Sequence, residues 1–518
     1  MKSRQRMTLA LAAGLAASAL AAAAMAAPEP TKVRIDSGVL VGTADGDVRA
    51  FKGVPYTASP VGALRWAPPK RPAAWNGERA ADQYGPSCPQ PMKADGKPNE
   101  GGAAGPTSED CLFLNVWASK TAHKAPVMLW IHGGSNAYGA GSLMPYDGSA
   151  FVRDGVILVS INYRLGVLGF AAHPALTKAA RPGDPLVGYG VMDQIAALKW
   201  VQRNITAFGG DPGNVTVFGE SAGGSDTLTL LASPLAKGLF AKAIVESGGG
   251  WRAPITLAMA EADGVKMAIK LGLPEKATAE QLRAIPVESL IGPGMRGSDV
   301  AVDGRLLTES PSQAFADGHA ADVPLMIGSN SHEASLLSLM KIPASMMLAT
   351  QPPAVIAAYA DEKTDNAKAE AIFTDGVMGG PARWVAAREA GGQPAWLYHF
   401  SYVLDVQRLI GQRADHDTEI PYVFDSWDHL GALAAAFGGK VPMSAGDKAV
   451  THTIHSCWVS FAKTGVPVCD GAPAWPAYTP ANDTLMEFDK TIELKQHFRK
   501  EHLDVIEAQT LPKLQLGN

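Results

Sequence analysis

The chain has 518 residues, of which 47% are hydrophobic and 18% are charged. This balance excludes a disordered or fibrous protein and provides enough apolar material for one large core. The formal net charge is −5 and no run of Lys and Arg occurs, so the sequence offers phosphate groups no basic surface and we expect no nucleic-acid partner.

The N-terminus has the pattern of a secretory signal peptide over residues 1–26. Three basic residues, the last of them Arg6, precede an Ala- and Leu-rich run, and small residues follow up to Ala26. We expect cleavage after Ala26 and an exported protein, periplasmic or secreted. A membrane anchor is the alternative, but the run is short for a span of about 20 residues, so stable membrane insertion after cleavage is not expected.

The next elements indicate an α/β protein. Residues 33–57 alternate apolar and polar side chains around Gly-Asp turns, which predicts a small leading sheet of antiparallel strands. Short apolar runs then alternate with helical stretches, as in a mostly parallel central sheet covered by helices on both faces. These runs are residues 113–117, 127–131, 156–162, 215–218, 243–246, 325–327 and 396–400. Apolar spacings of three and four predict a helix over residues 189–204.

Two segments interrupt the alternation of strands and helices. Residues 251–302 and 334–394 are rich in Ala, Leu and Met, and we interpret them as helical cap elements over the sheet. No internal repeat or long low-complexity linker is visible. We therefore expect a single catalytic domain over residues 27–518.

The segment Gly219-Glu220-Ser221-Ala222-Gly223 directly follows the apolar run VTVF and precedes a helix-compatible stretch. A serine on such a sharp strand-to-helix turn presents its hydroxyl above the sheet, and the flanking glycines permit the strained backbone. The five-residue pattern alone is weak evidence. Its strand-turn-helix context predicts that Ser221 is a nucleophile.

A second loop, WIHGGS, ends another predicted strand. A nucleophilic serine needs backbone N–H groups where negative charge develops on the attacked carbonyl oxygen. We expect Gly134, Ser135 and Ala222 to supply them. An ordinary glycine-rich turn is the alternative.

Four cysteines, Cys88, Cys111, Cys457 and Cys469, occur in the chain. An even number in an exported protein favours two disulfides, and the short separations favour pairing 88 with 111 and 457 with 469. Four buried free thiols are the alternative, which stays more open for the second pair.

Several segments together resemble the type-B carboxylesterase and cholinesterase family over nearly all of residues 27–518. They are FGGDPGNVTVFGESAG, SEDCLFLNVW, NYRLGVLGF, VDGRLLTESP, PLMIGSNSHE and FAKTGVPV. The resemblance implies an α/β-hydrolase fold, ester hydrolysis through an acyl-enzyme, no cofactor or metal, and a disulfide from Cys111 back to Cys88.

The same resemblance implies the remaining catalytic residues. His416, in ADHDTEIPYVF, matches the histidine position, and Glu333, at the end of SNSHE, matches the acid. For both, an ordinary loop residue is the alternative. The neighbouring His332 is expected at the surface or beside the triad. Three further residues, Glu220, Ser247 and Glu419, match family positions behind the triad. We expect them to orient the triad; the alternative is that they are ordinary buried polar groups.

The chain departs from the family at three positions. Ser135 stands where a third glycine is common, and Asn136 replaces a large hydrophobe, so we expect a more polar wall on the acyl side. Asp417 follows His416 where glycine is usual.

These features predict a serine carboxylesterase that acts on neutral esters of small to medium size. Cholinesterases hold a choline cation on a tryptophan in the loop corresponding to residues 89–110, which here contains no aromatic residue. Trp251 could line the acyl pocket, contact a cation or belong to the core. The alternatives are an esterase dedicated to one bulky ester and a non-catalytic adhesion or scaffold relative, which the intact triad argues against.

Overall fold

The computed structural model describes residues 29–292, 294, 295, 297, 299–430, 440–514 and 516. The expected signal peptide, residues 1–26, lies outside these described residues. Within the described part of the chain, no helix has the length and apolar content needed to cross a membrane.

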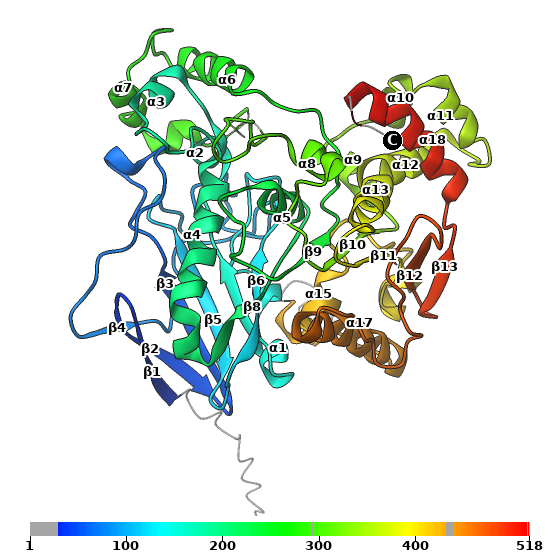
Figure 1. The fold of residues 1–518 in the computed structure, drawn as a ribbon, viewed down its shortest axis with the longest axis horizontal. Coiled ribbons are helices and arrows are strands. Elements are labelled where there is room, and N and C mark those ends of the chain that lie inside the picture. Colours follow the sequence, from blue (N-terminus) through cyan, green and yellow to red (C-terminus); the bar gives the residue numbers. More distant parts are fainter. Residues whose placement is uncertain are drawn as a thin grey trace, which may run out of the picture.

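A single mixed sheet runs through the protein (Figure 1). Its strands are β1 (Glu29–Ile35), β2 (Gly38–Asp45), β3 (Val48–Pro55), β4 (Glu78–Ala80), β5 (Phe113–Ser119), β6 (Ala125–Ile131), β7 (Ile157–Ile161), β8 (Gly210–Glu220), β9 (Lys242–Glu246), β10 (Leu325–Asn330), β11 (Ala395–Phe400), β12 (Thr484–Phe488) and β13 (Glu493–Gln496). Their order is β1-β2-β3-β5-β7-β6-β8-β9-β10-β11-β12-β13, with β4 beside β2. Neighbours from β7 to β12 are parallel, which confirms the mostly parallel central sheet.

The leading strands β1, β2 and β3 are antiparallel, as predicted. They do not form a separate small sheet, however, because β3 pairs with β5 and continues the main sheet, with Phe51 opposite Val116. The pairing of β3 with β5 joins segments far apart in the sequence, and the local alternation of side chains carries no information about it.

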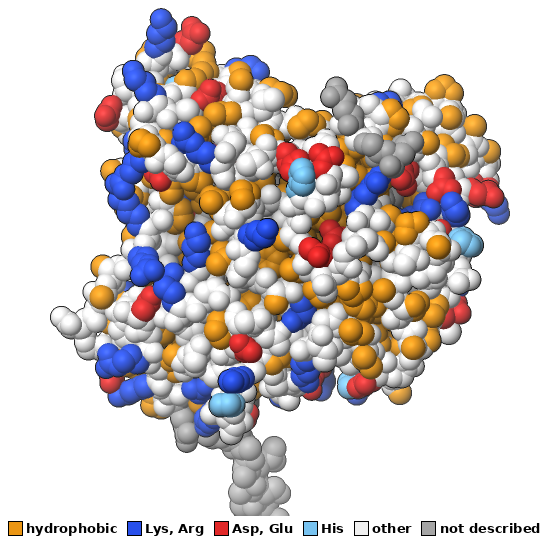
Figure 2. Space-filling model, in the orientation of Figure 1, with side chains coloured by type: hydrophobic (Ala, Val, Ile, Leu, Met, Phe, Trp, Pro, Cys, Tyr) orange, Lys and Arg blue, Asp and Glu red, His pale blue; other side chains and the backbone are white. Residues whose placement is uncertain are grey.

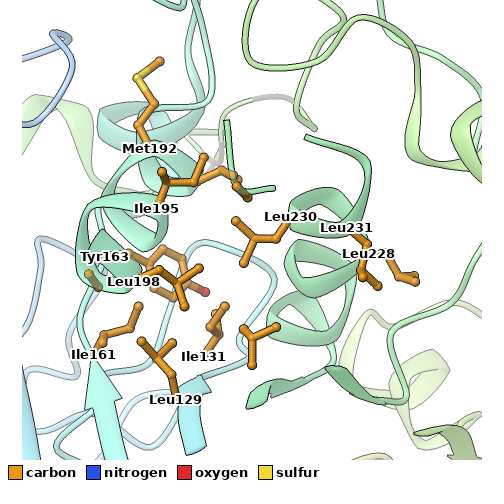
Figure 3. Packing of buried hydrophobic residues seen from close by; sticks show 14 of the residues in the cluster. Leu129, Ile131, Ile161, Tyr163, Met192, Ile195, Leu198, Leu228, Leu230 and Leu231 are labelled. Carbon is orange, nitrogen blue, oxygen red and sulfur yellow. The ribbon is translucent and has the colours of Figure 1, made fainter. Parts of the chain in front are cut away.

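Helices cover both faces of the sheet, and alternate residues of one strand reach the two sides. Leu129 and Ile131 of β6 pack with α4 (Tyr189–Asn204) and α5 (Ala222–Ala232). Figure 3 shows the facing side chains Met192, Ile195, Leu198, Leu228, Leu230 and Leu231. Met128 and Trp130 belong to a second core with α1 (Ser149–Arg153), α15 (Ile420–Phe424) and α17 (Ala445–Thr464). This period of two is expected for a strand buried on both faces.

The two predicted cap segments are largely helical. Residues 251–302 contain α6 (Leu257–Lys270) and α7 (Ala279–Arg283); residues 334–394 contain α9 (Ser335–Leu339), α10 (Ala344–Ala349), α11 (Pro353–Ala358), α12 (Asp365–Thr374) and α13 (Gly380–Glu389). Other α-helices in the described part of the chain are α2 (Gly166–Phe170), α3 (Pro174–Ala179), α8 (Pro311–Asp317), α14 (Asp405–Leu409) and α18 (Lys500–Leu514). In Figure 1 the two cap segments lie on either side of α5 and α8.

Both expected disulfides are present, Cys88–Cys111 and Cys457–Cys469. The first closes a loop that contains Gln90, whose side chain donates to the carbonyl oxygen of Gly139 at 2.8 Å and accepts from its N–H at 2.8 Å. The disulfide-bonded loop is thereby tied to the segment that follows the HGGS loop.

Candidate active site

Ser221 lies at the junction of β8 and α5, as the sequence predicts. Its backbone has φ 56° and ψ −119°, a conformation that residues other than glycine rarely adopt. Gly219 and Gly223 allow the turn because a Cβ atom at either position would lie within 2.6 Å of the carbonyl oxygen of Ile131. The N–H of Ser221 donates to the carbonyl oxygen of Glu246 at 2.9 Å. The tight turn therefore holds the hydroxyl at the end of the sheet.

Ser221, His416 and Glu333 form one chain of hydrogen bonds, although they come from three separate segments. His416 Nε2 lies 2.7 Å from Ser221 Oγ. On the other side of the ring, Nδ1 is hydrogen-bonded to Glu333 Oε2. His416 is 8% exposed and Glu333 is fully buried, so water does not compete for the contact between ring and carboxylate.

The carboxylate of Glu333 has further donors that fix its orientation. Its Oε1 accepts from the hydroxyl of Ser247 at 2.6 Å and from the N–H of Asn330 at 2.7 Å. The side chain of Asn330 also donates to the carbonyl oxygens of Asp415 and His416, at 2.8 and 3.0 Å. Asn330, which the sequence analysis did not single out, thus fixes both the acid and the histidine loop.

Further acids lie behind the triad. Glu220 Oε1 is 3.3 Å from His416 Nε2, and Glu419 accepts a hydrogen bond from Asn330. Burial, with repulsion from neighbouring carboxylates, raises the pKa of Glu220 and of Glu419 well above the usual range, and burial raises the pKa of Glu246 to about 8. Glu246 was missed in the sequence analysis.

The electrostatics of His416 predict its pH dependence. Burial lowers the pKa of His416, but the charge of Glu333 and its hydrogen bond to the ring raise the pKa above the usual 6.5, and Glu419 and Asp417 add to the increase. A general base works only when unprotonated, so activity falls as the pH drops through the raised pKa. We expect the acid limb of the kcat/KM profile for p-nitrophenyl butyrate to lie above pH 6.5.

The replacement Asp417→Gly supplies the matched comparison for this profile. It removes one of the charges that raise the pKa of His416, so the acid limb should move to lower pH. A wild-type limb at or below pH 6.5, or a limb that moves upward in the variant, would contradict this account.

The loop after β6 lies against Ser221. A Cβ atom on Gly133 would be 3.1 Å from Ser221 Cβ, and Gly134, Ser135 and Asn136 follow with φ of 99°, 56° and 53°. Among the described residues, none accepts a hydrogen bond from the N–H of Gly134 or Ser135. Ala222 is the first residue of α5, where a helix leaves its N–H groups unpaired. These three donors can bind an oxyanion.

The other residues predicted from the sequence lie either in contact with the triad or in its surroundings. Ser247, Glu220 and Glu419 lie with the triad, as described above. His332 Nδ1 lies 2.6 Å from Asp415 Oδ1. This contact holds the imidazole ring beside the triad. Trp251 is 8% exposed and packs edge-on against Trp384, with ring centroids 6.1 Å apart. Of the three roles considered for Trp251, that of a core residue agrees with this packing.

A cavity of about 480 Å³ opens in front of Ser221. Both cap segments contribute to its walls, through Arg252 from the first and Leu336, Met340 and Val377 from the second. Arg252 Nη1 is 3.2 Å from Asp299 Oδ1, which also lines the cavity. The cavity gives a small molecule access to Ser221 beside a partly apolar wall.

One group in the described part of the chain has three potential metal ligands close together. Ligand atoms of Glu309, Asp317 and His319 lie within 4.8 Å of one another. Two of the three residues are exposed, and none belongs to the hydrogen-bonded chain of Ser221.

Known proteins match this chain over most of its length. A model of the carboxylesterase family matches residues 29–353 and 350–506. The chain is 36% identical to fumonisin B1 esterase of Sphingopyxis macrogoltabida over 474 residues, which cover 87% of this chain and 85% of the relative. It is also 36% identical to para-nitrobenzyl esterase of Bacillus subtilis (strain 168) over 486 residues, covering 88% and 94%.

Solved structures show the same architecture. A PNB esterase and a carboxylesterase of Geobacillus stearothermophilus at pH 6.2 have TM-scores of 0.77 and 0.79 with this chain. Each is 32% identical to it, and each comparison covers 92% of this chain and 99% of the other.

Proposed function

The chain belongs to the carboxylesterase family, and from this we propose that Ser221, His416 and Glu333 are the catalytic residues of a serine ester hydrolase. The fold is the α/β-hydrolase fold and the protein is a carboxylic ester hydrolase. The observation that carries the residue assignment is the continuous chain from Ser221 Oγ through both nitrogens of His416 to Glu333.

The geometry supports hydrolysis in two half-reactions. Ser221 Oγ attacks the ester carbonyl carbon while His416 Nε2 takes its proton, and the N–H groups of Gly134, Ser135 and Ala222 bind the oxygen that becomes negative. Collapse of this intermediate breaks the ester C–O bond, and His416 returns the proton to the leaving alcohol. Water, deprotonated by His416, then attacks the acyl-enzyme; the bond from the acyl carbon to Ser221 Oγ breaks, His416 returns the proton to Ser221 Oγ, and the acid is released. Glu333 holds the imidazole in the tautomer that presents Nε2 to Ser221 and stabilises the imidazolium.

One catalytic domain over residues 27–518 agrees with the continuous sheet. Both cap segments line the cavity rather than standing apart from it. The two disulfides are typical of exported proteins, which supports a cleaved signal peptide over residues 1–26 and a periplasmic or secreted enzyme.

Esters of neutral, small to medium size fit the cavity best. Its volume lies within the range of small-molecule pockets, and two of its charged side chains, Arg252 and Asp299, pair with each other. Acidic and basic side chains are also interspersed over the face in Figure 2. An ester panel that varies acyl and alcohol size independently tests this size class, and a preference confined to one bulky ester would favour a dedicated esterase instead.

Choline esters should gain nothing from their charge. A quaternary ammonium is bound by an exposed aromatic face, in a contact worth about 2 kcal/mol when desolvated. Phe373 is the one aromatic residue among the described residues that line the cavity. It is 7% exposed and packs with Ala334 and Leu337. We expect kcat/KM for butyrylthiocholine to be no higher than for its uncharged 3,3-dimethylbutyl thioester isostere.

The comparison of these two thioesters isolates the charge because they share their shape and acyl group. A preference for the charged substrate of more than about tenfold, equivalent to about 1.4 kcal/mol, would show a cation site in the cavity and overturn the expectation.

A further inference from the structure

Asn136, the residue after the proposed donor Ser135, has its side chain held by hydrogen bonds. Its Nδ2 donates to Asp226 Oδ1 at 3.1 Å. The hydroxyl of Tyr163 lies 2.9 Å from Asn136 Oδ1 and 2.8 Å from the carbonyl oxygen of His132, and can donate to either. The loop that carries the proposed oxyanion donors is thus connected to α5 and to the segment after β7.

Asp226 extends this connection to α4. It is 2% exposed, lies one turn into α5, and its Oδ2 accepts from Gln194 Nε2 at 2.5 Å. Burial raises the pKa of Asp226 to about 7, against the lowering effect of the hydrogen bonds from Gln194 and Asn136. A carboxyl group buried against amides costs folding free energy, and such groups concentrate at functional sites.

The backbone of the loop needs this support. Ser135 and Asn136 have consecutive positive φ values of 56° and 53°, and the left-handed conformation costs about 1–2 kcal/mol for each residue other than glycine. Asparagine tolerates it better than most residues, and the side-chain hydrogen bonds add to that tolerance. If the loop relaxed, the N–H of Ser135 would turn away from the position that the oxyanion occupies.

We propose that Asn136 and Asp226 are positioning residues of the oxyanion hole, which hold the loop 133–136 against α5 so that the N–H of Ser135 stays aligned. This inference rests on the proposed function. It also gives a role to Asn136, which replaces the large hydrophobe of the family and thereby allows a hydrogen bond that an apolar side chain could not form.

Two variants break the contact from opposite sides. Asn136→Gly deletes the side chain without adding strain, because glycine accepts positive φ. Asp226→Leu removes the acceptor and keeps a side chain branched at the same carbon. Loss of a whole oxyanion donor costs about 100- to 1000-fold in kcat, so loosening one should lower kcat by about 10- to 100-fold with KM little changed. Because both act through one hydrogen bond, the double variant should be no slower than the slower single variant.

A conservative variant and a control separate positioning from general stability. Asp226→Asn keeps an acceptor for Asn136, and its new N–H can meet Gln194 Oε1 after an amide flip, since that buried oxygen has no hydrogen-bond partner among the described residues. Its kcat should be close to that of the wild type. Asn204→Leu removes another buried amide, at the far end of α4, which accepts from the N–H of Asp36 at 2.9 Å. This control should lower Tm and leave kcat unchanged.

The decisive readout is the inhibition constant of a trifluoromethyl ketone, whose Ser221 adduct carries an oxyanion in the hole. We expect it to rise in Asn136→Gly and Asp226→Leu in proportion to the loss of kcat/KM, whereas a merely structural role would move Tm alone. The proposal is overturned if folded Asn136→Gly and Asp226→Leu keep kcat within about threefold of the wild type, or if Asp226→Asn or Asn204→Leu is equally impaired. A wild type that hydrolyses no ester would instead contradict the proposed function itself.

Discussion

Ser221→Ala is expected to fold like the wild type and to lose about a million-fold in kcat on p-nitrophenyl butyrate. The variant lacks the oxygen that forms the acyl-enzyme, and only the oxyanion donors and the cavity remain to assist water. Circular dichroism and Tm, measured beside the kinetics, establish that the fold is retained.

Ser233→Ala is the matched control for this loss. It removes a serine hydroxyl at the other end of α5, which donates to the carbonyl oxygen of Leu306 at 2.7 Å, and it should keep its activity. If Ser221→Ala retained more than about a hundredth of wild-type kcat, Ser221 would not be the nucleophile.

Glu333→Gln should lower kcat by about 10,000-fold, the scale seen when a triad acid is replaced by its amide. Glutamine retains an oxygen that can accept from Ser247 and Asn330 at the present 2.6 and 2.7 Å. Its amide N–H, however, would donate to His416 Nδ1 and place the ring proton on Nε2, which then cannot accept the proton of Ser221. The structure predicts an enzyme with intact geometry and the wrong tautomer.

Glu370→Gln serves as the control for the glutamate variant. Glu370 pairs with Arg413 at 2.7 Å and lies 3.7 Å from His332 Nε2, close to the triad but outside its hydrogen-bonded chain. A loss of less than about tenfold in Glu333→Gln, or an equal loss in the control, would show that Glu333 does not orient the base.

The parts of the fold that could be predicted from the sequence have local causes. Strands buried on both faces are continuous apolar runs, and each of the seven predicted runs coincides with one of the strands β5 to β11. The helix over residues 189–204 is long and amphipathic, and it has these bounds in the structure. The strand-turn-helix context of Ser221 likewise lies within one short segment.

The parts that were missed depend on contacts between distant segments. The attachment of the leading strands through β3 and β5 is a matter of register. Strand β13 is short and reads Glu-Leu-Lys-Gln, with exposed ends, so it has no apolar run. Asn330, Glu246 and Asp226 are unremarkable in the sequence, and their contacts with the triad segments and the loop arise only when β10, β9 and α5 come together.

His416 and Glu333 were predicted as triad members by resemblance, because no local pattern distinguishes a catalytic histidine from the other histidines of the chain. The structure adds the hydrogen bonds that place both residues beside Ser221. It also shows that Trp251, which sequence reasoning left open, is packed against Trp384.

Covalent labelling tests the central claim most directly. The folded wild type should be incubated with a fluorophosphonate, digested and analysed by mass spectrometry, beside Ser221→Ala treated identically. The account predicts one phosphonylated serine, Ser221, with loss of esterase activity in step with labelling and no label in the variant. An active wild type that remains unlabelled at Ser221, or that carries the label on another serine, would contradict it.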